Sequence, residues 1–273
     1  MRRLIFSDLH ANPFAFKKML RLAEELKADS LFSLGDVIGY NSYPGECLAM
    51  MRENEIPSLL GNHEAMIVEE LTPESCKSER GQNAVRVSRE LLSVEEREEI
   101  RRWPSRWEFN EICLAWHAAF DSLYRTVNTV ERARPQFEEL SRLQKDICFF
   151  GHTHRPGLFI QNKKTGGVEY DVTLQKRALT EENRYLINPG TLGEPRHGLP
   201  MSFVMFDDRA MTVEYHVLTL SEEEKRQLRK NNRDVFGITS LSRLPKQIRE
   251  KGRRWYYRMG GIKDALVGAP SKR

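Results

Sequence analysis

The sequence predicts an α/β fold with parallel strands in its N-terminal half. Three short apolar stretches, residues 3–7, 30–34 and 56–60, each run directly into a polar cluster, and helical segments separate them. Short apolar stretches bounded by turn residues are typical of buried strands. Strands that alternate with helices favour a parallel sheet. Proteins of this class usually place their chemistry at the ends of such strands.

The helices of this half follow from their caps and their apolar spacing. Asn12 can cap a helix, and Pro13 suits its first turn; apolar residues then recur at helical spacing up to Leu26. Pro44 opens a second helix that we expect to end near Glu53. Residues 65–105 are charged and look helical up to a Trp-Pro pair.

The second half is predicted to be richer in strands. We expect strands at 107–109 and 112–116, a helix around 136–143, and a strand at 147–150. Further turn residues divide the chain up to residue 218. The strands that we expect there are 170–174, 184–187, 201–206 and 211–218.

Composition bounds the class of protein. A chain of 273 residues with 40% hydrophobic and 30% charged residues is ordinary for a soluble globular protein. No apolar run approaches the roughly 18 residues that a membrane span needs. The N-terminal apolar run is soon interrupted by Asp8, which argues against a signal peptide. The four cysteines form no CxxC pair, so we expect reduced thiols, no membrane association and a cytoplasmic location.

Charge divides the chain near residue 220. Residues 221–273 hold 15 Lys and Arg against 6 Asp and Glu, whereas residues 1–220 hold 28 against 33. Such asymmetry favours a boundary between a domain of residues 1–220 and a basic, partly helical extension of residues 221–273. Ser221 and Glu224 have the spacing of a helix capping box.

The basic extension admits several interpretations: a solvated appendage, binding to nucleic acid or to an acidic partner, or packing onto the main domain or a second subunit. Trp255, Tyr256 and Tyr257 stand among its basic residues, a composition that also suits stacking with nucleic acid. A solvated appendage is the default interpretation of a charged run. Three consecutive aromatic residues can also pack onto the main domain or onto a second subunit, so a homo-oligomer stays open.

The most informative stretch is Phe149–Pro156. His152 and His154 follow the predicted strand at 147–150, and Gly151 lets the backbone turn at its end. In an extended segment, residues i and i+2 project from the same face, so both imidazoles can approach one small volume. Imidazole is the commonest side-chain ligand for transition metals, whereas two surface histidines in a turn would be the structural alternative.

Five strand ends carry polar groups that could share a metal centre. Five of the seven histidines lie at these ends, and only His197 and His216 lie elsewhere. Carboxylate, imidazole and one amide oxygen together suit Mn, Fe, Co, Ni or Zn. The ligands are too many for one tetrahedral ion, so two ions that share a carboxylate are the simplest solution. The candidates are Asp8 and His10, Asp36, Asn62 and His63, His117, and His152 and His154.

The order of these motifs resembles the calcineurin-like metallophosphoesterase superfamily. The matching motifs are Asp8-x-His10, GDVIG, GNHE, a histidine at a strand end and GHTH. The sub-pattern GDVIGY, GNHE and INPGTLGEPR looks most like its small bacterial and archaeal phosphodiesterase branch. The resemblance covers about residues 1–218. It implies a four-layer α/β/β/α sandwich of two mixed sheets flanked by helices.

The resemblance also implies roles for individual residues. His63 would be the proton donor for the leaving oxygen, and a hydroxide that bridges two divalent ions would be the nucleophile. Of the candidate metals we expect manganese first, with Fe, Ni, Co or Zn as alternatives. The implied ligands are Asp8, His10, Asp36 and His154 for the first ion, and Asp36, Asn62, His117 and His152 for the second.

Three further residues could contact the substrate. Arg196 could hold a phosphate with two hydrogen bonds, although it could equally be an exposed arginine. Tyr40 and Asn41 could line the mouth of the site, or could support the loop from within. One motif departs from the common family pattern, because Trp116 precedes the fourth-motif histidine and Ala118 follows it where many relatives have glycine.

These observations predict a metal-dependent phosphoric ester hydrolase that acts on phosphodiesters. A phosphomonoesterase for proteins or nucleotides and a diadenosine tetraphosphate hydrolase would use the same metal core, so they stay open. A scaffold protein with this fold is the alternative outside the enzymes, but such proteins typically lose metal ligands that this sequence keeps. Nucleic-acid binding through residues 221–273 is a further alternative.

Overall fold

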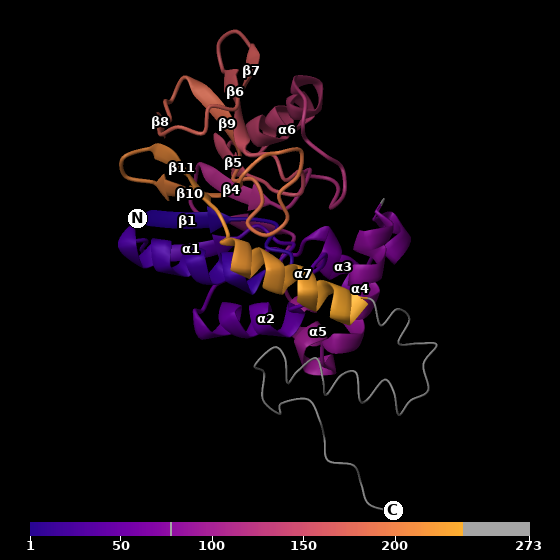
Figure 1. Cartoon of the computed structure of the whole chain (residues 1–273). Coiled ribbons are helices and arrows are strands. Elements are labelled where there is room, and N and C mark those ends of the chain that lie inside the picture. The colour runs from indigo at the N-terminus through magenta and orange to yellow at the C-terminus, as the bar shows by residue number, and fades with distance from the viewer. Residues whose placement is uncertain (77, 237–273) are drawn as a thin grey trace, which may run out of the picture.

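Two β-sheets lie face to face between two layers of helices in the computed structural model, which describes residues 1–76 and 78–236 (Figure 1). The first sheet has the strand order β2-β1-β10-β11-β8 and the second the order β3-β4-β5-β9-β6-β7. The strands of the first sheet are β1 (Arg2–Phe6), β2 (Ser30–Ser33), β8 (Arg177–Ala178), β10 (Met201–Asp207) and β11 (Thr212–Leu218). Those of the second are β3 (Arg106–Glu108), β4 (Cys113–Trp116), β5 (Ile147–Phe149), β6 (Gly157–Asn162), β7 (Val168–Asp171) and β9 (Asn183–Asn188).

Both sheets are mixed. In the first sheet, β1 pairs in parallel with β2 and antiparallel with β10. In the second, β4, β5 and β9 are parallel, and β6 runs antiparallel to β9. Because parallel strands end at the same edge, the loops after β4 and β5 start side by side, as do those after β1 and β2. The predicted class of two mixed sheets flanked by helices is confirmed.

The helices are divided unevenly between the two sides. One helix, α6 (Val130–Arg142), lies against the second sheet, and the others lie on the side of the first sheet (Figure 1). These are α1 (Pro13–Glu25), α2 (Pro44–Glu53), α3 (Asn62–Ile67), the 3-10 helix Pro73–Ser75, α4 (Glu79–Leu91), α5 (Val94–Arg101) and α7 (Glu222–Phe236). No helix in the described part of the chain is both long enough and apolar enough to cross a membrane.

Strand β1 shows how the four layers are held together. Its alternate residues Leu4 and Phe6 pack with Phe16 of α1, whereas Ile5 points to the opposite face and packs with Phe149 of the second sheet. All five side chains are fully buried. Burial of one large apolar side chain stabilises a fold by about 1.5–3 kcal/mol, so the apolar residues on both faces of β1 favour a layer on each side of it.

Two predicted starts of helices are confirmed. Asn12 caps α1, where its Oδ1 accepts a hydrogen bond from the backbone N–H of Ala15 at 3.2 Å. Ser221 caps α7, because its Oγ accepts from the N–H of Glu224 at 3.2 Å and the Glu224 carboxylate accepts from the N–H of Ser221. The boundary near residue 220 stays a prediction, and the aromatic cluster 255–257 lies outside the described residues.

The predicted strand at 56–60 is wrong. Only one isolated parallel bridge, between Ser33 and Ser58, forms there. The N–H of Leu59 and the carbonyl of Pro57 still bond to Ser33, but Pro57 has no N–H with which to extend the ladder. Two hydrogen bonds suffice to place this segment beside β2, which sets the position of the following motif.

The helix expected around 136–143 begins earlier, at Val130, although Pro135 lies inside it. Thr129 caps this helix, and the proline ring faces solvent on its exposed side. A proline at this point removes one helical hydrogen bond, so the sequence signal there predicts a break. Strands β6 and β8 were not predicted individually, and the strand expected at 170–174 is β7, which begins and ends earlier.

Candidate metal centre

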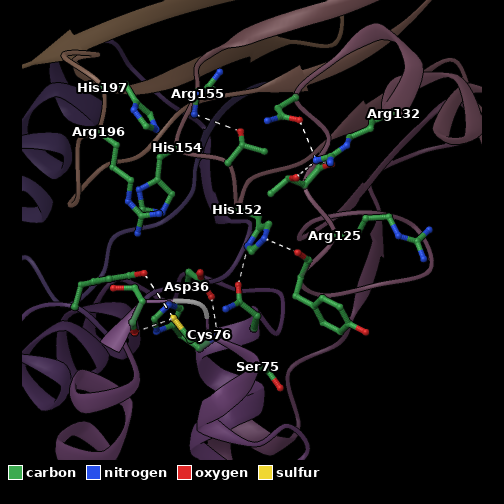
Figure 2. A pocket seen from close by; sticks show the side chains of 18 residues that line it. Asp36, Ser75, Cys76, Arg125, Arg132, His152, His154, Arg155, Arg196 and His197 are labelled. Carbon is green, nitrogen blue, oxygen red and sulfur yellow. Dashed lines mark hydrogen bonds between the residues drawn. The ribbon is translucent and has the colours of Figure 1, made fainter. Parts of the chain in front are cut away.

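All eight predicted polar side chains meet at one edge of the two sheets, and five of them line the pocket that Figure 2 shows. The loops after β1, β2, β4 and β5 carry most of them, and α3 carries the rest at its first two residues. Seven are buried and the eighth, His152, is half-buried. They are Asp8, His10, Asp36, Asn62, His63, His117, His152 and His154.

A first group of donor atoms comes from Asp8, His10 and His154. The Nε2 atoms of the two histidines lie 3.0 Å apart, and Asp8 Oδ1 lies 3.2 Å from His154 Nε2. Asp8 Oδ1 is fully buried and has no hydrogen-bond partner among the described residues. A buried carboxylate oxygen without a partner is costly. A cation bound between these three side chains would remove that cost.

A second group comes from Asp36, His117, His152 and Asn62. The amide oxygen of Asn62 lies 2.8 Å from His152 Nδ1 and 3.1 Å from His117 Nε2. Asp36 Oδ2 lies 3.5 Å from His117 Nε2 and also 3.9 Å from His10 Nε2 of the first group. The Asp36 carboxylate therefore stands between the two groups, where one residue can serve both.

Backbone carbonyls fix the orientation of the imidazoles. Nδ1 of His117 donates to the carbonyl of Leu34 at 2.8 Å, and Nδ1 of His154 donates to that of Glu194 at 2.7 Å. His10 donates in the same way to Ile38 at 3.2 Å. These bonds leave Nε2 of each ring free to face the site, which is the arrangement of metal-ligating histidines.

His152 is oriented in the opposite sense. Its Nε2 donates to the carbonyl of Tyr124 at 3.0 Å, so its Nδ1 faces Asn62 (Figure 2). No side-chain signal in the sequence could identify the carbonyls that orient the rings, because every residue carries one. They depend on where the loops pass, and therefore on the fold.

The ligand loops adopt unusual backbone conformations. Asp8, His10, Asp36, His152 and His154 all have positive φ angles, between 48° and 65°. The segment that carries His152 and His154 is therefore not extended, and its two imidazoles join different groups rather than one small volume. Non-glycine residues in this region cost of order 1 kcal/mol or more each, and such residues cluster at functional sites.

A glycine lets the loop after β5 approach β1. A Cβ atom on Gly151 would lie 1.9 Å from Ser7 Oγ and 2.9 Å from Asp8 Oδ2. With no side chain there, the N–H of His152 donates to Asp8 Oδ2 at 3.0 Å. Gly151 is therefore required for a close approach that joins the two sheets at the site.

Glu64 supports the loop that carries Asp36, although the sequence interpretation left it without a role. Its buried carboxylate accepts hydrogen bonds from the N–H groups of Asp36 at 2.7 Å, Ile38 at 3.0 Å and Gly61 at 3.0 Å. Burial and the nearby Asp36 raise the pKa of Glu64 to about 8, against the effect of these donors. The carboxylate holds the Asp36 loop on α3, and its capping-box spacing from Gly61 was the available signal.

The titration of the site favours cation binding. Burial alone would raise the pKa of the Asp36 carboxyl, but His117 and His63 hold it well below its ordinary value. Burial, together with His154 and His63, lowers the pKa of His10 well below 6.5. Burial and His117 lower that of His152 to about 4. The carboxylate is thus charged, and both imidazoles are neutral ligands at neutral pH.

His63 occupies the wall of the pocket beside both groups. Its backbone N–H donates to Asp36 Oδ1 at 2.9 Å, and its ring packs against those of His10 and Tyr40. Its Nδ1 is buried without a hydrogen-bond partner among the described residues. A Cβ atom on Gly39 would lie 2.2 Å from this Nδ1, so the glycine makes room for the ring.

The pocket above the candidate ligands has a volume of about 590 Å³. Arg125 and Arg132 lie on one side of His152, and Arg196 lies on the other (Figure 2). With Arg155, four arginines line the pocket, and Asp36 is the single carboxylate among its described lining residues. The pocket therefore suits an anion.

The three predicted substrate residues differ in position. Arg196 lines the pocket, and its guanidinium carbon lies 4.7 Å from the centroid of the Tyr40 ring. Tyr40 also lines the pocket but is only 6% exposed. Asn41 lies beneath the site, where its side chain donates to the carbonyl of His10 at 2.8 Å. The departure at Trp116 leaves His117 in place, because the tryptophan ring packs away from the site, near Phe120.

The donor set fits two divalent cations. Imidazole nitrogens, carboxylate oxygens and an amide oxygen converge in two groups. Mixed nitrogen and oxygen ligands suit borderline transition metals. Two ions that share Asp36 would satisfy the unpartnered Asp8 Oδ1 and the facing Nε2 atoms of His10 and His154.

Comparison with known proteins agrees with this geometry. Residues 1–210 match the profile of the calcineurin-like phosphoesterase superfamily domain. The chain belongs to this superfamily. The match to the profile ends before α7. Membership of this superfamily suggests that the chain hydrolyses phosphoesters.

Individual relatives support the same assignment. An uncharacterized protein of Methanocaldococcus jannaschii, MJ0912, is 26% identical over 216 residues, which cover 77% of this chain and 84% of the relative. A metallophosphoesterase from Sphaerobacter thermophilus has a similar structure, with a TM-score of 0.70, 25% identity, and coverage of 91% of this chain and 96% of that one. A hypothetical protein from Pyrococcus horikoshii, PH1004, shares the fold with a TM-score of 0.62 and 15% identity, at 91% and 96% coverage.

We expect metal affinity at the second group to depend on pH. Burial would lower the pKa of His117, but Asp36 raises it to about 9 in the metal-free protein. A cation that binds His117 must therefore displace one proton, so affinity should rise about tenfold per pH unit from pH 7 until it levels near pH 9. Competition with a chelator at several pH values measures this. Affinity that is constant over this range would show that His117 is already neutral.

Proposed function

We propose that this protein is a phosphodiesterase that uses two divalent ions, with manganese as the most effective metal. One observation carries the proposal: two groups of ligand side chains share Asp36 at the floor of an arginine-lined pocket. When bound, two such ions would polarise the phosphoryl oxygens and lower the pKa of water, so that a strong nucleophile is available at neutral pH. The remaining contributions come from the chain itself.

The ligand side chains would be held rigid during the reaction. The carbonyls of Leu34, Ile38, Tyr124 and Glu194 orient the four imidazoles, and the Glu64 carboxylate fixes the Asp36 loop. Catalysis by charge stabilisation depends on groups that do not need to reorganise as charge develops. The loop conformations with positive φ would serve this rigidity.

His63 would act on the leaving oxygen. Burial lowers the pKa of His63, so its imidazole is neutral in the free site and carries one N–H that can donate a hydrogen bond. A bound phosphate anion would raise that pKa, so the imidazole would take up a proton from solvent and, as imidazolium, pass it to the departing alkoxide. The hydrogen bond from His63 would thus first stabilise the negative charge that develops on the leaving oxygen and then deliver the proton to it.

The shape and charge of the pocket favour a diester with further negative charge. A phosphodiester extends from phosphorus in two directions, and the pocket has room and arginines on both sides of His152 (Figure 2). Arg125 and Arg132 are held in place, the first by Asp121 at 2.7 Å and the second by Asn128 at 3.2 Å. The exposed ring of Tyr124 lies beside them and could stack with a base. We therefore favour a nucleotide-containing diester.

Hydrolysis of model esters tests this proposal. The protein would be stripped with a chelator and reconstituted separately with Mn, Ni, Co, Fe, Zn and Mg. We expect Mn to restore hydrolysis of bis-p-nitrophenyl phosphate in preference to the monoester p-nitrophenyl phosphate. Preference for the monoester would indicate a phosphatase instead. Two bound ions without hydrolysis of any ester, including dinucleotides and diadenosine tetraphosphate, would favour a scaffold.

A further inference from the structure

Helix α7 contacts the loop that follows β2 through Asn231 and Asn232, and it lies on the same side of the sheets as α3 and α4 (Figure 1). It lies outside residues 1–210, which match the superfamily model. Its apolar contacts come from three residues: Leu228 packs against the main core, Val235 is buried with Val87 and Leu91 of α4, and Phe236 packs against them. Its polar contacts with the loop are more specific.

A chain of side-chain hydrogen bonds joins α7 to the backbone of a candidate ligand. Asn232 Nδ2 donates to Asn41 Oδ1 at 2.8 Å, and Asn41 Nδ2 donates to the carbonyl of His10 at 2.8 Å. Ser42 Oγ donates to Asn232 Oδ1 at 2.7 Å and accepts from Asn231 Nδ2 at 2.8 Å. In each of these four hydrogen bonds, a donor therefore faces an acceptor.

Most of these hydrogen-bonded side chains are shielded from water, and Asn232 is half-buried. Asn231 and Asn41 are each 2% exposed, and Ser42 is fully buried. Buried amides are costly unless their hydrogen bonds are made, and an apolar pair could have docked the helix without that cost. Docking alone therefore does not account for asparagines at these positions, whereas an oriented hydrogen bond to His10 does.

The loop that α7 holds determines the shape of the first ligand group. The carbonyl of Ile38 accepts from His10 Nδ1, and the ring of Tyr40 packs edge-on against the His10 ring at 4.7 Å. Gly39 and Tyr40 both have positive φ angles, of 96° and 52°. A loop in this conformation needs outside support, and Asn41 and Ser42 receive it from α7.

We propose that Asn232 and Asn231 are positioning residues that hold His10 for the first metal ion through Asn41 and Ser42. This inference rests on the proposed metal centre, but it does not depend on which ester is hydrolysed. His10 belongs to the first ligand group and not to the second. Loss of these hydrogen bonds should therefore lower the affinity for one ion more than the affinity for the other. A helix with only a structural role would have no such preference.

The test compares two variants of the full-length protein. Asn232→Asp keeps the acceptor for Ser42 but places an oxygen against Asn41 Oδ1, so Asn41 must turn its amide and lose its bond to His10. We expect one of two Mn²⁺ binding steps in a calorimetric titration to weaken about tenfold, the usual effect of a residue that supports a ligand, while the other changes little. Asn232→Ala, which removes the donor without adding charge, should do the same.

Val235→Ala is the matched control. It loosens α7 through its apolar contact and leaves the asparagines intact, so it should lower the melting temperature of the metal-free protein but keep both binding steps. The proposal is overturned if Asn232→Asp weakens both steps equally, changes neither, or affects metal binding no more than Val235→Ala. A wild-type protein that binds no metal would instead refute the metal centre itself.

Discussion

Asp36→Asn should abolish stable binding of both metal ions. Asparagine keeps the volume and the Oδ1 that accepts the N–H of His63, but it removes the charge and replaces the oxygen that lies between His10 and His117. Each ion contributes several kcal/mol to the reaction, so we expect diester hydrolysis to fall by about 10³-fold or more. Elemental analysis after reconstitution and dialysis should find well below one ion per chain.

A matched control keeps this result specific. Asp146→Asn removes a carboxylate that pairs with Lys163 and Arg184, outside the pocket, and should leave metal content and activity unchanged. Melting curves of both variants check that the fold persists. Two ions retained by Asp36→Asn would contradict the shared role of this residue.

His63→Ala should lower turnover by about 10²–10⁴-fold, the usual contribution of a positioned acid, while metal content stays near that of the wild type. The loss should be larger for diesters with a poor leaving group than for p-nitrophenyl esters, whose leaving group needs little protonation. His216→Ala is the control, because His216 lies on β11, stacked on Phe203 and outside the pocket.

The metal content of His63→Ala separates two roles. The ring of His63 is also close enough to His10 and Asp36 to join them as a ligand. If it does, the variant should lose an ion, and its activity should recover at high metal concentration. A turnover deficit with two ions bound, unchanged by added metal, would support the role on the leaving oxygen.

Much of the site could be predicted because its ligands follow apolar strands. Residues 3–7, 30–34 and 147–150 are short apolar runs that end in Asp or His, and histidines are few enough for their positions to be informative. Strand ends in parallel sheets meet at one edge, so the sequence pattern already implies proximity. The two mixed sheets came from the resemblance rather than from periodicity.

Other features could not be predicted because they depend on distant contacts. Pro57 reduces a predicted strand to one bridge with β2. The missing N–H of Pro57 matters only because β2 lies beside it, and the sequence does not show which strand is the neighbour. Pro135 is tolerated in α6 because its ring faces solvent. The bonds from Asn231 and Asn232 to the loop after β2 join residues almost 200 positions apart, and no local pattern signals them.

The carbonyls that orient the four imidazoles have a consequence for divergence within the superfamily. A main-chain oxygen survives any substitution that keeps the backbone path, so mutations of Leu34, Ile38, Tyr124 or Glu194 need not disturb the rings that they anchor. Geometry around the ions is thus inherited with topology, while side chains at the rim are free to drift. A lineage could exchange its arginines, and with them its substrate, without rebuilding the reactive centre.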